Sequence, residues 1–106
     1  MQQLVKEFNE QKKVHKKIMP TNARLLDIAS EIGELNKEYL RISKYGTNEF
    51  VLTQDFLLEY GDVLYSLLSL ADELNFNAQE ALNMAIEKYK ARIKKNNNMG
   101  NINNKG

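Results

Sequence analysis

The chain has no cysteine and no tryptophan among its 106 residues, and it has only one proline and one histidine. Without cysteine it forms neither disulfide bonds nor a thiolate nucleophile. His15 alone is too little for a histidine-based ligand set. There is no apolar run near the length of a membrane span and no apolar signal segment after Met1. We therefore expect a protein that stays in water, in the cytoplasm.

The sequence also lacks the alternation of apolar and polar residues that is typical of strands, and it has no internal repeat. We therefore predict an all-α protein, a four-helix bundle. Residues 1–95 form the expected domain. Because a chain of this length has a modest core, we expect a homodimer before a monomer. The Asn-rich residues 96–106 have almost nothing to bury, and we expect a disordered tail there.

The first two predicted helices are separated by the only proline. A short amphipathic helix lies before Pro20, and Thr21 or Asn22 can cap the next one. This second helix runs from about residue 23 to 44, because apolar residues recur there at helical spacing. Its predicted core stripe consists of Leu25, Ile28, Ile32, Leu35, Tyr39 and Ile42.

Two further helices follow, and each has a recognisable start. Thr53 is the predicted cap of the third, and Asn77 has capping-box spacing to Glu80 at the start of the fourth. Gly33 and Gly61 fall inside the second and third helices, where a glycine costs about 1 kcal/mol relative to alanine. Either another group approaches the backbone at these glycines, or the helices pack tightly there.

Two short acidic motifs are the most informative feature of the chain. They are Glu31-Ile-Gly-Glu34 and Glu59-Tyr-Gly-Asp62, one inside each of the two central helices. The net charge of +1 hides their setting, because residues 23–62 carry a charge of −4 between two positive flanks. Like charges near an apolar core repel each other, so these carboxylates favour a cation.

A helical projection puts each motif along one border of an apolar stripe. Asp27 and Glu38 share this border on the second helix, and Asp55 and Ser66 share it on the third. If the two helices pack antiparallel, the borders face a common groove and four carboxylates converge. Oxygen ligands without histidine or cysteine suit Mg²⁺, with Mn²⁺ as a substitute.

The alternative is that the acids are ordinary charges facing solvent. A solvated helix face normally carries lysines four residues after its acids. After Glu31, Glu34 and Glu59, these positions hold Leu35, Glu38 and Val63. Only Lys37 is close enough to help, and the repetition of this pattern on two helices favours a metal site.

Basic residues flank the acidic segment on both sides. On the fourth helix, Lys88 and Arg92 lie at the edge of the apolar stripe, where they could bind a phosphate or only cover the rim of the core. The basic run of residues 12–17 could attract nucleotides or RNA, or be solvated.

The two motifs, on consecutive helices of a small all-α chain, resemble those of the MazG-like family of nucleoside triphosphate pyrophosphohydrolases. The similar stretches are residues 30–35 and 59–74, within a resemblance that covers about residues 8–94. The resemblance implies hydrolysis of nucleoside triphosphates to the monophosphate and pyrophosphate. It also implies dimers or tetramers, and Mg²⁺ held by Glu31, Glu34, Glu59 and Asp62. One carboxylate would orient or deprotonate the attacking water, and Lys88 or Arg92 would bind the leaving pyrophosphate.

The chain departs from the family pattern at two places. Ser30 stands where many members have another glutamate, and there is no tryptophan to stack on the base. Phe8 is the candidate replacement for that tryptophan, and the alternative is that it belongs to the core. Three other functions stay open: a phosphoribosyl-ATP pyrophosphohydrolase with the same site, a non-catalytic helical adaptor with an acidic groove, and an RNA-binding module that uses the lysines.

Overall fold

The computed structural model describes residues 1–13 and 20–105, with side chains described for residues 1–11 and 20–97. Within these ranges the protein is all-α, with four helices and no strand, as the sequence predicts. The helices are α1 (Gln2–Lys13), α2 (Thr21–Ser43), α3 (Gln54–Glu73) and α4 (Ala78–Lys105). They belong to two compact units, residues 1–76 (unit 1) and residues 77–106 (unit 2). No helix in the described part of the chain combines the length and the apolar character that crossing a membrane requires.

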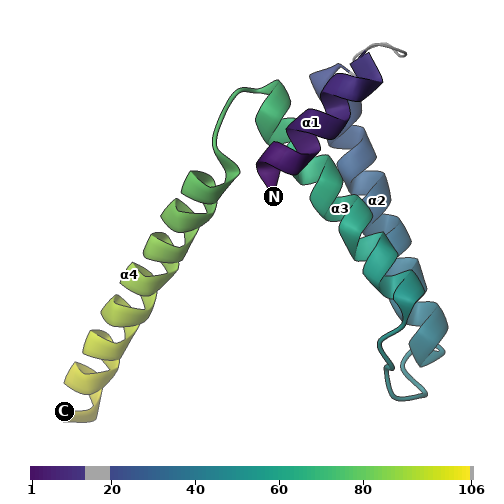
Figure 1. Ribbon diagram of the computed structural model, residues 1–106. Helices are drawn as coiled ribbons and strands as arrows, with labels where there is room; N and C mark the ends of the chain where they lie inside the picture. Colours follow the sequence, from purple (N-terminus) through teal and green to yellow (C-terminus); the bar gives the residue numbers. More distant parts are fainter. Residues whose placement is uncertain (14–19, 106) are drawn as a thin grey trace. The chain divides into compact units, whose positions relative to one another are not determined.

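The centre of unit 1 is an antiparallel pair, in which α2 and α3 lie side by side and are joined by residues 44–53 (Figure 1). Helix α2 ends because the chain turns left-handed, with φ of 48° at Lys44, 58° at Tyr45 and 87° at Gly46. The Tyr45 N–H donates to the Leu40 carbonyl at 2.9 Å, which satisfies one of the last free carbonyls of the helix. The reversal brings the two acidic motifs onto neighbouring helices.

Three aromatic rings hold the connecting loop against the helix pair. The Phe50 ring stacks on Tyr39 of α2 with centroids 5.0 Å apart, and it meets Phe56 of α3 edge-on at the same distance. Such ring pairs add to the stabilisation that comes from their buried area. The loop therefore helps to fix how α2 and α3 are aligned.

The predicted cap of α3 is confirmed, and that of α2 is wrong. Thr53 Oγ1 accepts a hydrogen bond from the Phe56 N–H at 3.1 Å. Helix α2 is capped by Pro20, whose carbonyl accepts from the Arg24 N–H at 2.9 Å, so Thr21 is already helical. Proline can take this position because its extended ψ of 152° lies outside the helix and no backbone N–H is needed there.

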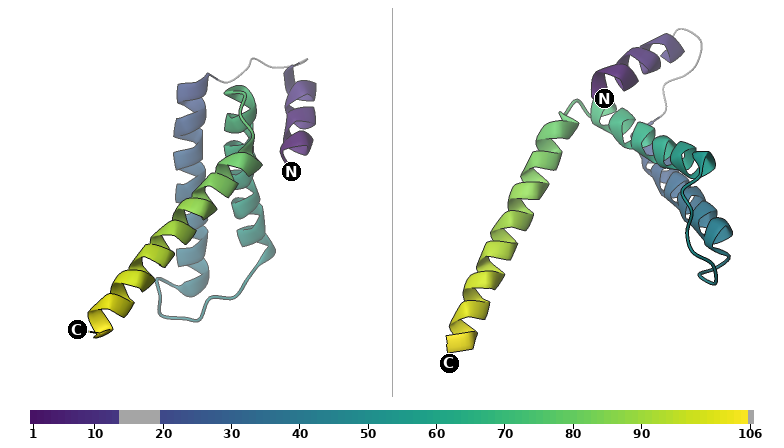
Figure 2. Two further views of the ribbon diagram at one scale, coloured as in Figure 1. Left: turned by 90° about the vertical axis from the view of Figure 1, so that its left-hand side faces the viewer. Right: turned by 60° about the horizontal axis from the view of Figure 1, so that its bottom comes forward.

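Helix α1 packs against α3, as the views in Figures 1 and 2 agree. The Asn9 side chain donates to Ser69 Oγ at 3.0 Å and accepts from the Tyr65 hydroxyl. Near the start of α1, Gln2 Nε2 donates to the Phe76 carbonyl at 2.9 Å. These polar contacts fix α1 on the C-terminal half of α3.

The core of unit 1 is small. The buried apolar residues among those described are Val5, Ile28, Leu68 and Ala71. The buried polar ones are Arg24, Ser43, Ser66 and Ser69. Several residues of the predicted stripes, such as Leu25, Ile32 and Leu67, are instead exposed. One partner helix covers only part of a stripe this wide, so α2 and α3 each leave apolar surface open.

Unit 2 is a single helix. The Asn77 side chain accepts from the Glu80 N–H at 2.9 Å, which confirms the predicted start of α4. The backbone stays helical to Lys105 and so includes most of the Asn-rich segment, for which the sequence predicts disorder. Extending an existing helix avoids the cost of nucleation, so residues with weak helix propensity can follow the well-formed turns before them.

Candidate acidic site on helices α2 and α3

Three of the four motif carboxylates come together where α2 and α3 face each other. One oxygen from each of Glu31, Glu59 and Asp62 lies within 4.8 Å of the other two. Glu31 and Glu59 are partly buried, and Asp62 is exposed. The antiparallel packing and the border position of both motifs together create this group, which we call the acidic triad.

Glu34, the fourth predicted ligand, is not part of the acidic triad. Its side chain is 52% exposed, and its carboxylate lies 3.9 Å from the Lys37 ammonium, one turn further along α2. It is still close enough for its charge to raise the pKa values of Glu31 and Glu59. Ligation by Glu34 therefore stays a prediction.

The acidic triad is a place of electrostatic repulsion. The pKa of Glu31 is raised, first by desolvation and then by the charges of Asp62, Asp27, Glu59 and Glu34. The pKa of Glu59 is also raised, again by desolvation first and then by nearby acids, of which Asp62 is the strongest. A cation bound here would relieve this repulsion.

The basic residues nearby are engaged with other acids. Arg41 donates to Glu38, which lowers the pKa of that glutamate, and Arg24 pairs with Asp27 and Glu73. The Arg41–Glu38 pair was not predicted from the sequence, where only Lys37 was expected to lie close to the acids. No member of the acidic triad forms an ion pair with any of the described basic side chains.

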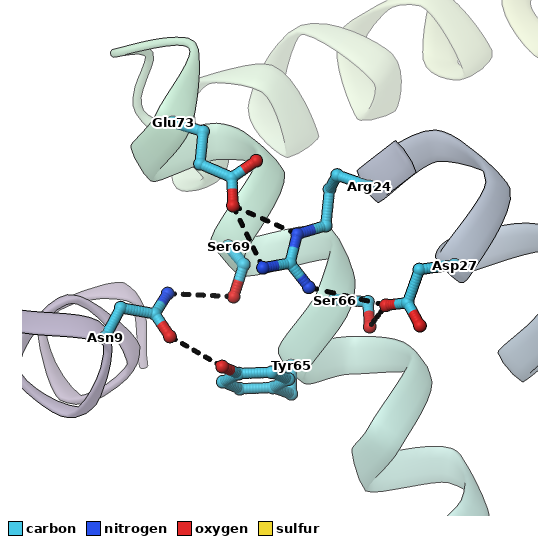
Figure 3. A network of polar contacts seen from close by, with 7 residues as sticks. All are labelled: Asn9, Arg24, Asp27, Tyr65, Ser66, Ser69 and Glu73. Carbon is cyan, nitrogen blue, oxygen red and sulfur yellow. Dashed lines mark hydrogen bonds and ion pairs between the residues drawn. The ribbon is translucent and has the colours of Figure 1, made fainter. Parts of the chain in front are cut away.

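A polar network beside the acidic triad was also missed by the sequence analysis (Figure 3). Arg24 of α2 lies at its centre and joins Asp27 to Glu73 of α3, while Ser66 of α3 donates to Asp27 at 2.8 Å. The helical projection did place Asp27 and Ser66 on the two facing borders, and their contact confirms that these borders meet. Arg24 gave no signal of its own, because its partner Glu73 is 49 residues away.

Neither predicted reason for the two motif glycines is seen in unit 1. A Cβ added at Gly33 or at Gly61 would meet no heavy atom within 4 Å. The backbone at both glycines therefore faces open space within the described part of unit 1. This leaves room beside both motifs for a group from outside the described chain.

The three predicted substrate-binding residues lie on other elements. Phe8 is on α1, exposed, and its ring meets Tyr65 edge-on with centroids 5.8 Å apart. Lys88 and Arg92 are exposed on α4, which belongs to unit 2, and the Lys88 ammonium lies 5.1 Å from the centroid of the Tyr89 ring. The side chains of residues 12–17 lie outside the described residues, so the basic run there stays a prediction.

Comparison of the chain with models of known protein families, with curated proteins and with solved structures finds no match. Three carboxylate oxygens at this spacing, without nitrogen or sulfur donors, fit the ligand preference of Mg²⁺ or Mn²⁺. Exposed acidic groups are also common without an ion, so the acidic triad alone does not establish a metal.

Proposed function

We propose that the chain is a Mg²⁺-dependent hydrolase that cleaves nucleoside triphosphates to the monophosphate and pyrophosphate. The observation that carries the proposal is the convergence of Glu31, Glu59 and Asp62 from two separate motifs, without a described basic partner. Mg²⁺ is typically held by few carboxylates and completes its shell with water and substrate phosphates. The likeness of both motifs to the MazG-like family supports this substrate class.

The acidic triad has the properties that such a reaction needs. Glu31, Glu59 and Asp62 would hold the ion, with Glu34 as the fourth proposed ligand. A bound ion would neutralise phosphate oxygens and make a bound water more acidic. One carboxylate of the site is proposed to orient the attacking water or to accept its proton.

The remaining assignments belong to the same proposal. Lys88 and Arg92 are proposed to bind phosphate oxygens, and Phe8 to contact the base. The open apolar surface of α2 and α3 supports assembly of copies into a dimer or tetramer, which would complete the four-helix bundle arrangement. Such an enzyme would remove surplus nucleotides in the cytoplasm.

The test is pyrophosphate release from a panel of common ribo- and deoxynucleoside triphosphates with Mg²⁺. We expect Glu31→Gln, Glu59→Gln and Asp62→Asn each to reduce the rate by about 100-fold or more, because each loses charge that stabilises the reaction. Glu49→Gln, an exposed loop glutamate, is the control and should keep the wild-type rate. Far-UV circular dichroism should show unchanged helicity in all four variants.

Glu34→Gln decides the number of ligands. Loss of activity as large as in Asp62→Asn would support a four-carboxylate site, whereas an unchanged rate would restrict ligation to the acidic triad. Unchanged turnover in Asp62→Asn would contradict the metal site itself.

One other function is favoured by a specific observation. Because the acidic triad is partly exposed and lacks a described basic partner, it could equally receive a lysine from another protein, as in a non-catalytic adaptor. Absence of any pyrophosphate release, from nucleoside triphosphates and from phosphoribosyl-ATP, together with salt-sensitive binding of a lysine-rich peptide, would support the adaptor. Release from phosphoribosyl-ATP alone would keep the site and change the substrate.

A further inference from the structure

The network beside the acidic triad is built around a buried charge. Arg24 is only 5% exposed, and its Nε and Nη2 atoms lie 3.0 and 2.9 Å from Glu73 Oε1 (Figure 3). Its Nη1 atom reaches Asp27 Oδ2 at 3.3 Å. The guanidinium group therefore bridges α2 and α3 and fixes two carboxylates at once.

Asp27 is held from two sides through a single oxygen. Its Oδ2 atom accepts from Arg24 and, at 2.8 Å, from the hydroxyl of Ser66, which is 2% exposed. The other oxygen, Oδ1, points away from these donors in Figure 3 and accepts no hydrogen bond from the residues that the structure describes. The Asp27 side chain is 30% exposed, so this oxygen can meet solvent.

The position of Asp27 connects the network to the acidic triad. Asp27 precedes Glu31 by one turn of α2, and its charge is one of those that raise the pKa of Glu31. Asp27 is not among the three residues whose oxygens lie within 4.8 Å of one another, so we do not count it among the proposed ligands.

Stability gives little reason for the network. Taking the Arg24 guanidinium and most of the Glu73 carboxylate out of water is costly, and buried ion pairs often stabilise a fold no more than apolar residues of the same size. Here Glu73 Oε2 is also buried without a hydrogen-bond partner in the described part of the chain. What the network does provide is a single fixed position for the Asp27 carboxylate.

We propose that Asp27 is a positioning residue of the acidic site: Arg24 and Ser66 fix its carboxylate, and its Oδ1 atom accepts a hydrogen bond from a water held at the acidic triad. The inference depends on the proposed function, because it assigns Asp27 to the same cation. Carboxylates behind the direct ligands of a metal commonly orient those ligands and waters, and their loss weakens metal binding about 10–100-fold.

The test is calorimetric titration of the metal-free full-length chain with Mn²⁺. We expect Asp27→Asn and Ser66→Ala each to weaken Mn²⁺ binding by about 10-fold. Ser66→Ala is the sharper variant, because it leaves every charge in place and changes only what holds Asp27. Ser69→Ala is its matched control, a buried serine one turn away on α3 that contacts Asn9, and should bind Mn²⁺ as the wild type does.

The double variant separates positioning from a general loss of structure. If Ser66 acts through Asp27, adding Ser66→Ala to Asp27→Asn should cause no further loss of Mn²⁺ affinity. Wild-type affinity in Ser66→Ala, or an equal loss in Ser69→Ala, would overturn the inference and leave the proposed function intact. A wild-type protein that binds no Mn²⁺ would overturn both.

Discussion

At the scale of single residues, the acids of unit 1 differ in what faces them. Asp27 and Glu38 each accept hydrogen bonds from an arginine, and the pKa of Glu38 is lowered as a result. Glu31 and Glu59 face other acids, and their pKa values are raised. Two glutamates on the same helix, Glu31 and Glu38, therefore have pKa values shifted in opposite directions.

This difference gives a prediction for Glu31→Gln in the metal-free protein. Because the pKa of Glu31 is raised in the fold, the folded state holds its proton more tightly than the unfolded state. Protonated Glu31 therefore stabilises the fold at pH values below the ordinary glutamate pKa. This contribution is lost as the pH rises through the raised pKa of Glu31. We expect Glu31→Gln to raise the melting temperature at neutral pH, and this gain to vanish near pH ~4.

Glu38→Gln serves as the control with the opposite sign. The pKa of Glu38 is lowered by the Arg41 hydrogen bond, so its contribution is present above the ordinary glutamate pKa and is lost as pH falls. This variant should melt only slightly below the wild type at neutral pH, because its Arg41 partner is 62% exposed. A lower melting temperature for Glu31→Gln as well would contradict the repulsion described for the acidic triad.

A second prediction at this scale concerns Arg24. Removing the guanidinium in Arg24→Ala leaves Asp27 and Glu73 near each other without their buried partner. We expect the free energy of unfolding, measured in urea, to fall by about 3–5 kcal/mol. Arg41→Ala, which breaks an ion pair whose arginine is largely exposed, should leave the urea midpoint nearly unchanged. Equal effects of the two substitutions would show that burial of Arg24 does not matter for stability.

At the scale of elements, local sequence explains most helix boundaries. Thr53 and Asn77 cap the helices that the sequence predicts. Such a cap is predictable because the side-chain oxygen bonds to the backbone N–H only three residues later, a contact that needs no other part of the fold. The pattern of apolar residues also predicted the facing borders of α2 and α3. The same pattern could not predict which basic residue each acid would pair with. The partners of Glu34, Glu38 and Asp27 depend on side-chain directions and on the register between helices.

The open space at Gly33 and Gly61 gives a prediction for helix stability. Both glycines lie within helices, and a Cβ added at either would meet nothing within 4 Å. Alanine at each position should therefore increase the free energy of unfolding by about 1 kcal/mol, as measured in urea. Gly46→Ala is the control with the opposite sign, because the φ of 87° at Gly46 disfavours any side chain.

Activity of the same variants carries separate information. If Gly33→Ala or Gly61→Ala is more stable but releases pyrophosphate more slowly, a substrate or a second copy approaches the backbone at that glycine. A loss of stability in either variant would contradict the open space seen in the single chain.

At the scale of the whole molecule, much apolar surface remains open. In α4, Leu82, Ile86, Tyr89 and Ile93 recur at alternating steps of four and three residues, and all are exposed. A single helix has no second element within its own unit against which to bury such a face. The sequence predicted that the apolar stripes would be buried, but it could not specify whether one chain contains the surfaces that cover them.

We predict that copies of the chain associate. Sedimentation should give a mass of at least a dimer of the 12.3 kDa chain, and the melting temperature should rise with protein concentration. Ile86→Lys, on the apolar face of α4, should weaken association, whereas Met84→Lys, an exposed position off that face, should not. A mass of 12.3 kDa at every concentration would rule out this assembly.

The small core of unit 1 also determines how a single copy responds to temperature. Among its described residues, the fully buried side chains are serines and one alanine, and large apolar side chains are mostly in contact with water already. Unfolding one copy therefore exposes little new apolar surface, and the heat capacity changes little. The stability of an isolated copy then varies only gently between cold and warm conditions, and any sharp thermal transition belongs to copies that bury these surfaces together.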